Sequence, residues 1–160
     1  MNVSSMMVKE LREKTKYGMM ECKKALVKAN GDIEKAIEFL NSKNVKSSIK
    51  ERETNEGIIE VYVHAGNKIG AIIELNCETD FVSNTPEFKD LAKNLLIQIV
   101  ATNPSCISKE DLNSENDISS VLMEQKYIKD SEKTIKDLID EYIKKFGENI
   151  VIKRFQRYEL

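Results

Sequence analysis

An apolar run closely followed by a well-marked helix restricts the fold of this chain more than any other feature of its sequence. Residues 69–76 are rich in β-branched side chains and predict a largely buried strand. Thr85 is placed to cap a helix that opens with Pro86. The apolar residues of that helix recur at helical spacing: Phe88, Leu91, Ala92, Leu95, Leu96 and Ile99. The residues between the two elements therefore form a short connection that is held at both ends.

This connection contains Thr79, Asp80, Phe81 and Val82. An acid beside an aromatic residue, mounted between rigid elements, suggests a probe that enters a partner protein. On these four residues alone, a loop that only turns the chain is the commoner explanation. Glu78 is close in sequence to Asp80, but ordinary strand geometry does not make the two carboxylates converge, so we do not expect an acid–base pair.

The first 42 residues predict a unit of three short helices. Ser5 can cap the first helix, in which Val8 and Leu11 face inward. Residues 19–29 predict the second helix, and Asp32 starts the third. Such helices bury only a small core, which is typical of a docking module rather than a catalyst.

The second of these helices carries the candidate partner-binding residues of the unit, Met19, Met20 and Lys23. Methionine adapts to irregular apolar partner surfaces, and the lysine adds charge beside that apolar spot. The alternative is that both methionines fill the small core. We expect one methionine inside and the other outside.

The sequence pattern changes after a polar stretch. We therefore predict a docking domain at residues 1–42, a linker at 43–56 and an α+β core domain at 57–160. In the core, residues 58–64 and 69–76 predict a β-hairpin.

The rest of the core predicts helices and one more strand. Helices are expected at residues 86–102 and 134–143, and residues 108–120 predict a loop or an irregular helix. Residues 149–155 alternate well enough for a third strand. The predicted core is about three antiparallel strands with covering helices.

Residues that commonly carry catalysis or bind metals are sparse. Cys22, Cys77 and Cys106 are far apart and odd in number, which argues against a disulfide framework and a zinc site. His64, the single histidine, has no neighbour that would make it a ligand or a base. Phosphate-loop, nucleophile-elbow and HExxH motifs do not occur. We predict no enzymatic activity, no metal and no cofactor.

Composition and charge favour a soluble protein with a protein partner. The apolar runs are shorter than the roughly 20 residues that span a bilayer, and the first residues lack a secretion signal. We expect a cytoplasmic location, with an organellar matrix also consistent. Residues 1–55 hold 12 basic and 8 acidic residues, and residues 56–160 hold 13 and 19. Neither part is basic enough to predict direct nucleic-acid binding, and no membrane partner is expected.

Three separated motifs together resemble the translation elongation factor Ts family of bacteria and organelles. The first motif comprises Leu11-Arg12, Thr15, Gly18-Met19-Met20, Cys22-Lys23-Lys24-Ala25-Leu26, Asn30-Gly31-Asp32 and Ala36. The second is Leu75-Asn76-Cys77-Glu78-Thr79-Asp80-Phe81-Val82, and the third is Gly147-Glu148-Asn149-Ile150 with Arg154-Phe155. The motifs stand in the family's order and span most of the chain. With this resemblance, a functional role for the Thr79 connection becomes the favoured interpretation.

The resemblance implies a guanine-nucleotide exchange factor for the GTPase elongation factor Tu. It implies a ubiquitin-associated-like N-terminal domain that docks on the GTPase domain through Met19, Met20 and Lys23. Asp80 and Phe81 would enter beside the magnesium ion of the bound nucleotide, with Thr79 and Val82 on either side. Phe146 and Gly147 would make further partner contacts.

The chain departs from the family pattern in ways that bear on its assembly. Lys16-Tyr17 stand where small residues commonly precede Gly18, and Phe146 stands where an aliphatic residue is usual. The second core half and the helical hairpin of many relatives have no counterpart. A single small core half leaves strand edges and an apolar face that are hard to cover. Short family members pair two copies, so we predict a homodimer.

Two other functions fit parts of the sequence. A ubiquitin-associated-type adaptor would use the three helices and leave Asp80 and Phe81 without a role. A ribosome-associated or RNA-associated protein would use Lys153, Arg154 and Arg157, although the acidic core predicts weak and salt-sensitive binding.

Overall fold

A computed structural model describes residues 3–42, 49–112 and 118–160, and the chain divides into two units. The first unit takes in Met1–Glu53 and Asp140–Asn149, and the second takes in Thr54–Ile139 and Ile150–Leu160. The first unit is therefore discontinuous in sequence, which the sequence does not predict. Residues 43–48 of the predicted linker lie outside the described residues, and the predicted domain boundaries stay a prediction.

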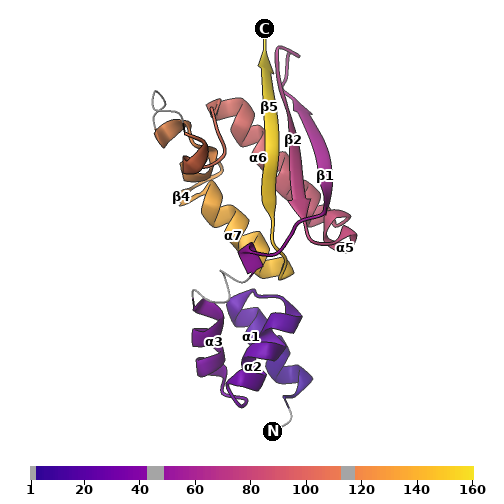
Figure 1. The fold of residues 1–160 in the computed structure, drawn as a ribbon, viewed down its shortest axis with the longest axis vertical. Helices are drawn as coiled ribbons and strands as arrows, with labels where there is room; N and C mark the ends of the chain where they lie inside the picture. Colours follow the sequence, from indigo (N-terminus) through magenta and orange to yellow (C-terminus); the bar gives the residue numbers. More distant parts are fainter. Residues whose placement is uncertain (1–2, 43–48, 113–117) are drawn as a thin grey trace. The chain divides into compact units, whose positions relative to one another are not determined.

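Three helices make up most of the first unit: α1 (Ser5–Thr15), α2 (Met19–Lys28) and α3 (Ile33–Asn41) (Figure 1). Their inner faces bury small and aliphatic side chains: Val8, Leu11, Cys22, Ala25, Leu26, Ala36 and Leu40. The cap of α1 is Ser4 rather than the predicted Ser5, because the helix begins one residue earlier than expected. The hydroxyl of Ser4 accepts a hydrogen bond from the Met7 amide at 3.3 Å. Asp32 caps α3 as predicted.

The second unit is built on three antiparallel strands, β1 (Glu56–Val63), β2 (Ile69–Cys77) and β5 (Val151–Glu159). Their order is β1-β2-β5, so β2 is central (Figure 1). Ile73 of β2 pairs with Glu60 on one side and with Phe155 on the other. The predicted hairpin and third strand are therefore present, and β5 starts later and runs further than residues 149–155.

One face of this sheet is covered by α6 (Pro86–Thr102), which contacts β1 and β2 (Figure 1). The hydroxyl of Thr85 accepts a hydrogen bond from the Phe88 amide at 3.2 Å, so the predicted cap is confirmed. The side chains buried at this contact come from both elements: Ala71, Ile73 and Leu75 of β2, and Phe88, Leu91, Leu95 and Ile99 of α6. The core of the second unit lies between the sheet and this helix.

A short hairpin after α6 was not predicted from the sequence. Its strands are β3 (Lys126–Tyr127) and β4 (Asp130–Thr134). The buried side-chain amide of Gln98 holds this hairpin in place. The amide donates to the Lys126 carbonyl oxygen at 3.1 Å and accepts from the Ile128 amide at 2.9 Å. In the described part of this stretch, short 3₁₀ turns precede the hairpin at Lys109–Asp111, Ile118–Ser120 and Leu122–Glu124. Residues 113–117 of the predicted loop lie outside the described residues.

The last helix, α7 (Ile135–Phe146), begins in the second unit, and its residues from Asp140 onward belong to the first. Thr134 and Asp137 cap its start reciprocally, with the Thr134 amide donating to the Asp137 carboxylate at 2.9 Å. The predicted α+β class is confirmed. Among the described helices, none is long and apolar enough to cross a membrane.

Candidate partner-binding surfaces

The connection between β2 and α6 is a single helical turn, α5 (Asp80–Ser83). Its backbone is fixed at both ends by hydrogen bonds. The Thr79 carbonyl oxygen accepts from the Ser83 amide at 3.2 Å. The Asp80 carbonyl oxygen accepts from the Asn84 amide at 3.0 Å and from the Asn84 side chain at 2.9 Å. The turn is therefore a stiff mount for the side chains that it carries.

Phe81 projects from this turn with 83% of its surface exposed. The next two residues, Val82 and Ser83, are buried and anchor the turn to the unit, whereas Asp80 is exposed like Phe81. Burying a phenylalanine side chain stabilises a protein by about 1.5–3 kcal/mol, and this chain forgoes that gain at Phe81. An exposed ring on a fixed turn is suited to being buried in a partner.

The outer side of α2 exposes two methionines. Met19 and Met20 are 60% and 62% exposed, so the expectation that one of them lies in the core is wrong. The inner side of α2 is already filled by its small and aliphatic residues, which leaves no place for a methionine. Both methionines and Lys23 line one cavity of about 580 Å³ together with Val8 and other α1 residues. The structure thus brings the three predicted residues of α2 together on one surface.

Phe146 and Gly147 lie against the start of α2. Gly147 has a φ of 71°, a left-handed conformation that favours glycine, and its amide donates to the Ile143 carbonyl oxygen at 2.8 Å. A Cβ placed on Gly18 would lie 3.4 Å from the Gly147 nitrogen and from the Phe146 carbonyl oxygen. Phe146 is half-buried, and its ring centroid is 6.0 Å from that of Tyr142. Phe146 and Gly147 therefore lie beside α2, and the contact is made by their backbone atoms.

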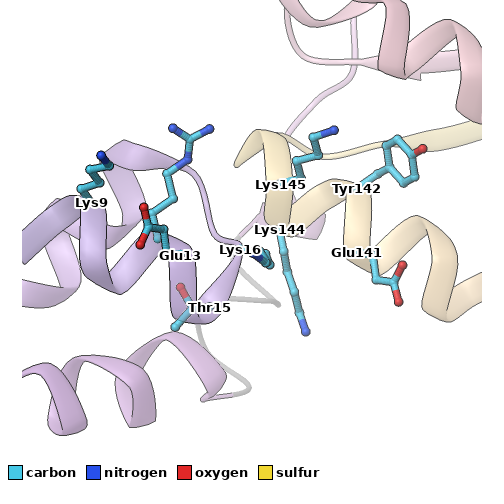
Figure 2. A pocket seen from close by; sticks show the side chains of 9 residues that line it. Lys9, Glu13, Thr15, Lys16, Glu141, Tyr142, Lys144 and Lys145 are labelled. Atoms are coloured by element: carbon cyan, nitrogen blue, oxygen red, sulfur yellow. The ribbon is translucent and has the colours of Figure 1, made fainter.

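A second cleft of the first unit, with a volume of about 680 Å³, is predominantly basic. Figure 2 shows its lining, from α1 and the loop after it on one side and from α7 on the other: Lys9, Glu13, Thr15, Lys16, Glu141, Tyr142, Lys144 and Lys145. With Arg12, five basic side chains face two acidic ones. A basic surface of this kind attracts acidic partners and mainly raises the association rate. The sequence does not reveal this cleft, because its two walls are far apart in the chain.

The departure at Lys16-Tyr17 has a structural explanation. Lys16 ends α1 with a φ of 60°, the left-handed conformation in which glycine is unstrained. Tyr17 is buried, and its hydroxyl donates a hydrogen bond to the Leu40 carbonyl oxygen at 2.6 Å. Burial raises the pKa of Tyr17, and the charges of Asp140 and Cys22 act in the same direction. Tyr17 is thus a core residue of the first unit.

The remaining candidate residues do not gather into a reactive site. Cys22 and Cys77 are buried and Cys106 is partly buried, and all three are free thiols. His64 is exposed, with its Nδ1 atom 3.2 Å from the Tyr62 hydroxyl. Within residues 3–42, 49–112 and 118–160, no group of three His, Cys, Asp or Glu side chains could hold a metal ion.

Comparisons with known proteins give one consistent result. The family model described as Elongation factor TS matches residues 2–117. The chain is 46% identical to the elongation factor Ts of Caldanaerobacter subterraneus subsp. tengcongensis over 192 aligned positions, which cover 98% of this chain and 96% of that protein. It is 42% identical to that of Desulfosudis oleivorans, covering 99% and 98% of the two chains. Since 192 aligned positions exceed the 160 residues of this chain, the first relative carries segments that this chain lacks.

Proposed function

The chain belongs to the elongation factor Ts family, and on this basis we propose that it acts in translation elongation as a guanine-nucleotide exchange factor for elongation factor Tu. In this role it binds another protein and makes or breaks no covalent bond. The compartment that fits is the cytoplasm, or an organellar matrix. The observation that carries the proposed mechanism is the 83% exposure of Phe81 on a turn that hydrogen bonds hold in place.

The proposed exchange step acts on the magnesium ion of the partner. A P-loop GTPase holds its nucleotide through backbone donors, a lysine and a magnesium ion that bridges phosphate oxygens. Phe81 enters a packed pocket near that ion and shifts the elements that support it. Asp80, exposed on the same turn, displaces the ion's hydration or its outer contacts. Thr79 and Val82 hold these two side chains at the required angle.

Binding of nucleotide and binding of this chain then weaken each other by the same factor. GDP leaves when the exchange factor binds, and GTP in turn releases the factor. The stable complex is therefore the one with the nucleotide-free GTPase. Because the backbone of α5 is already ordered, little conformational entropy is lost when Phe81 is buried.

Docking is proposed to occur through the first unit, which we regard as a ubiquitin-associated-like domain. Met19 and Met20 pack on a helix of the partner, and Lys23 adds charge at the rim of the same cavity. The basic cleft of Figure 2 steers an acidic partner surface toward this unit. Phe146 and Gly147 support this surface beside α2.

We further propose that two copies of the chain pair through the uncovered face of the sheet. Val61 and Ile72 are neighbours across β1 and β2, and Ile59, Val63 and Tyr158 extend the exposed apolar surface around them. These residues lie on the face opposite α6, since side chains alternate along each strand. Isolated exposed apolar residues are ordinary, but five on one face of a sheet, three of them along β1, are typical of an interface. A second copy offers the same strip and covers it by two-fold symmetry.

The two alternative functions have less support. Arg154 forms an ion pair with Glu74 at 2.6 Å, and Arg157 is largely buried and donates to the Val100 carbonyl oxygen at 3.1 Å. Of the three residues that an RNA-binding function would use, two thus have internal partners. A ubiquitin-associated-type adaptor would not need the exposed ring of Phe81.

The experiment that tests the proposal is release of a fluorescent GDP analogue from elongation factor Tu in a stopped-flow instrument. Addition of this chain should accelerate release in proportion to its concentration until binding saturates. Excess unlabelled GTP should dissociate the resulting complex. Release at the spontaneous rate would contradict the proposed function, and binding to ubiquitin or to ribosomal RNA in its place would favour one of the alternatives.

A further inference from the structure

A buried acid on α2 has no role in the surfaces described above. Glu21 is buried, whereas Met19 and Lys23 on the same helix are exposed. A spacing of two residues turns a helix by about 200°, so Glu21 points away from the partner-facing side. A buried carboxylate requires a cationic partner or hydrogen bonds. Among the described residues, Glu21 pairs with Lys24 at 3.1 Å and with Arg52 at 3.7 Å.

Arg52 links this acid to the segment after α7. Its Nη1 atom donates a hydrogen bond to the Gly147 carbonyl oxygen at 3.2 Å. Gly147 in turn lies against Gly18, the N-cap residue that precedes α2. The helix is therefore held at its N-cap, Gly18, by backbone packing and at Glu21, in its first turn, by the ion pair.

Asn149 fixes the position of Arg52 itself. Asn149 is 4% exposed, and its Nδ2 atom donates to the carbonyl oxygens of Lys50 and Arg52 at 3.0 and 2.8 Å. Lys50 adds an ion pair with Asp140 at 2.8 Å. A buried amide that satisfies two carbonyls of another segment is costly to remove, because those carbonyls would lose their donor.

We propose that Glu21, Arg52, Gly147 and Asn149 form a latch that sets the position of α2, so that Arg52 is a positioning residue for the partner-binding face. Arg52 acts on Met19 and Met20 through Glu21 and does not touch the partner. The same geometry assigns Gly147 to this latch, as a support for α2 at its first turn. The effect on partner binding rests on the proposed function, whereas the effect on the two methionines does not.

The first test reads the methionines in the free protein. In a sample with ¹³C-labelled methionine methyl groups, Arg52→Ala should shift and broaden the signals of Met19 and Met20. The signal of Met123, which lies in the second unit, should stay in place and serves as the internal control. Lys35→Ala is the matched control variant, because it removes an exposed ion pair with Asp32 on another helix. Unchanged signals of Met19 and Met20 in Arg52→Ala would overturn the latch.

The second test measures coupling at the partner. Arg52→Ala should weaken binding to nucleotide-free elongation factor Tu by about five- to tenfold, since residues in one contact network commonly couple to this extent. When Met19 and Met20 are both alanine, the same change should weaken binding by less than about twofold. Equal losses in the two backgrounds would show that Arg52 acts elsewhere and would overturn the proposal.

Two further variants keep the test independent of folding. Arg52→Lys retains the charge toward Glu21 and should restore most of the affinity, whereas Glu21→Gln should behave like Arg52→Ala with a smaller effect. If Arg52→Ala does not fold, the affinities of Arg52→Lys and Glu21→Gln for the nucleotide-free GTPase decide the question. Identical affinities for Glu21→Gln and the unmodified chain would overturn the latch. If the unmodified chain fails to release GDP, the proposed function fails, and the methionine signals still decide the latch.

Discussion

Replacing Phe81 by alanine should separate exchange activity from folding more sharply than any other single change. A phenylalanine buries about 200 Å² when fully covered. With 83% of it exposed in the free chain, about 165 Å² remains to be covered by a partner. At about 25 cal/mol per Å², complete burial corresponds to about 4 kcal/mol. Alanine keeps the backbone and Cβ part, so the expected loss is about 3 kcal/mol, or roughly a hundredfold in the exchange rate at low concentration.

The stability of the free chain should hardly change in this variant. The ring makes few contacts that folding could use, so the free energy of unfolding should move by less than about 0.5 kcal/mol. Phe88→Ala is the opposite case, because Phe88 is fully buried and its loss should lower the free energy of unfolding by about 3–5 kcal/mol. Ile128→Ala removes another exposed apolar side chain of the second unit and should alter neither property.

The assay combines stopped-flow release of fluorescent GDP with urea unfolding of each variant. An exchange rate for Phe81→Ala within about threefold of the unmodified chain would refute the proposed role of the ring, since about 0.6 kcal/mol is far below the expected loss. A large loss of stability in the same variant would refute the argument that the ring is idle in the free chain.

Three other changes test separate features of the structure. Lys16→Gly should raise the free energy of unfolding by about 0.5–1 kcal/mol in urea, because glycine relieves the left-handed strain; a decrease would contradict that. Tyr17→Phe should lower it by about 1 kcal/mol at neutral pH, because the Leu40 carbonyl loses its donor. Because the pKa of Tyr17 is raised in the folded chain, its contribution to the free energy of unfolding is complete below about pH 10 and is lost as the pH rises further. The free energy of unfolding of Tyr17→Phe should therefore decline less steeply toward about pH 11 than that of the unmodified chain. Val61→Glu should convert a dimer to chains of 18.3 kDa in sedimentation, and a parent chain that already sediments at that mass would refute the pairing.

Local signals in the sequence predict most of the elements correctly. The cap at Thr85, the start of α3 at Asp32 and the periodicity of α6 are each encoded within a few residues. The short hairpin of β3 and β4 is different, because its strands are brief and polar and have no apolar alternation. It depends on Gln98, whose hydrogen bonds reach about thirty residues along the chain. Hydrogen bonds between residues so far apart in the chain leave no local pattern in the sequence.

The candidate site was predictable to a similar degree. From the sequence alone, the junction of strand and helix and the family resemblance together indicate Asp80 and Phe81. The exposure of both methionines could not be predicted from the sequence, because it depends on how fully smaller residues fill the inner side of α2. The partnership of Arg52 with Gly147 joins residues that are 95 positions apart, so neither motif nor periodicity could reveal it.

The discontinuity of the first unit has a consequence for how the chain folds during synthesis. Its three helices leave the ribosome early, but Gly147 and Asn149, which complete the contacts around Arg52, are added roughly 5–20 s after Glu53 at ordinary elongation rates. If Arg52 positions α2 as proposed, the outer surface of the nascent helices reaches its final geometry only after the far end of the polypeptide has been made. If the proposed function holds, a partially synthesised chain would bind elongation factor Tu poorly, and productive binding would begin only when translation of this protein is nearly finished.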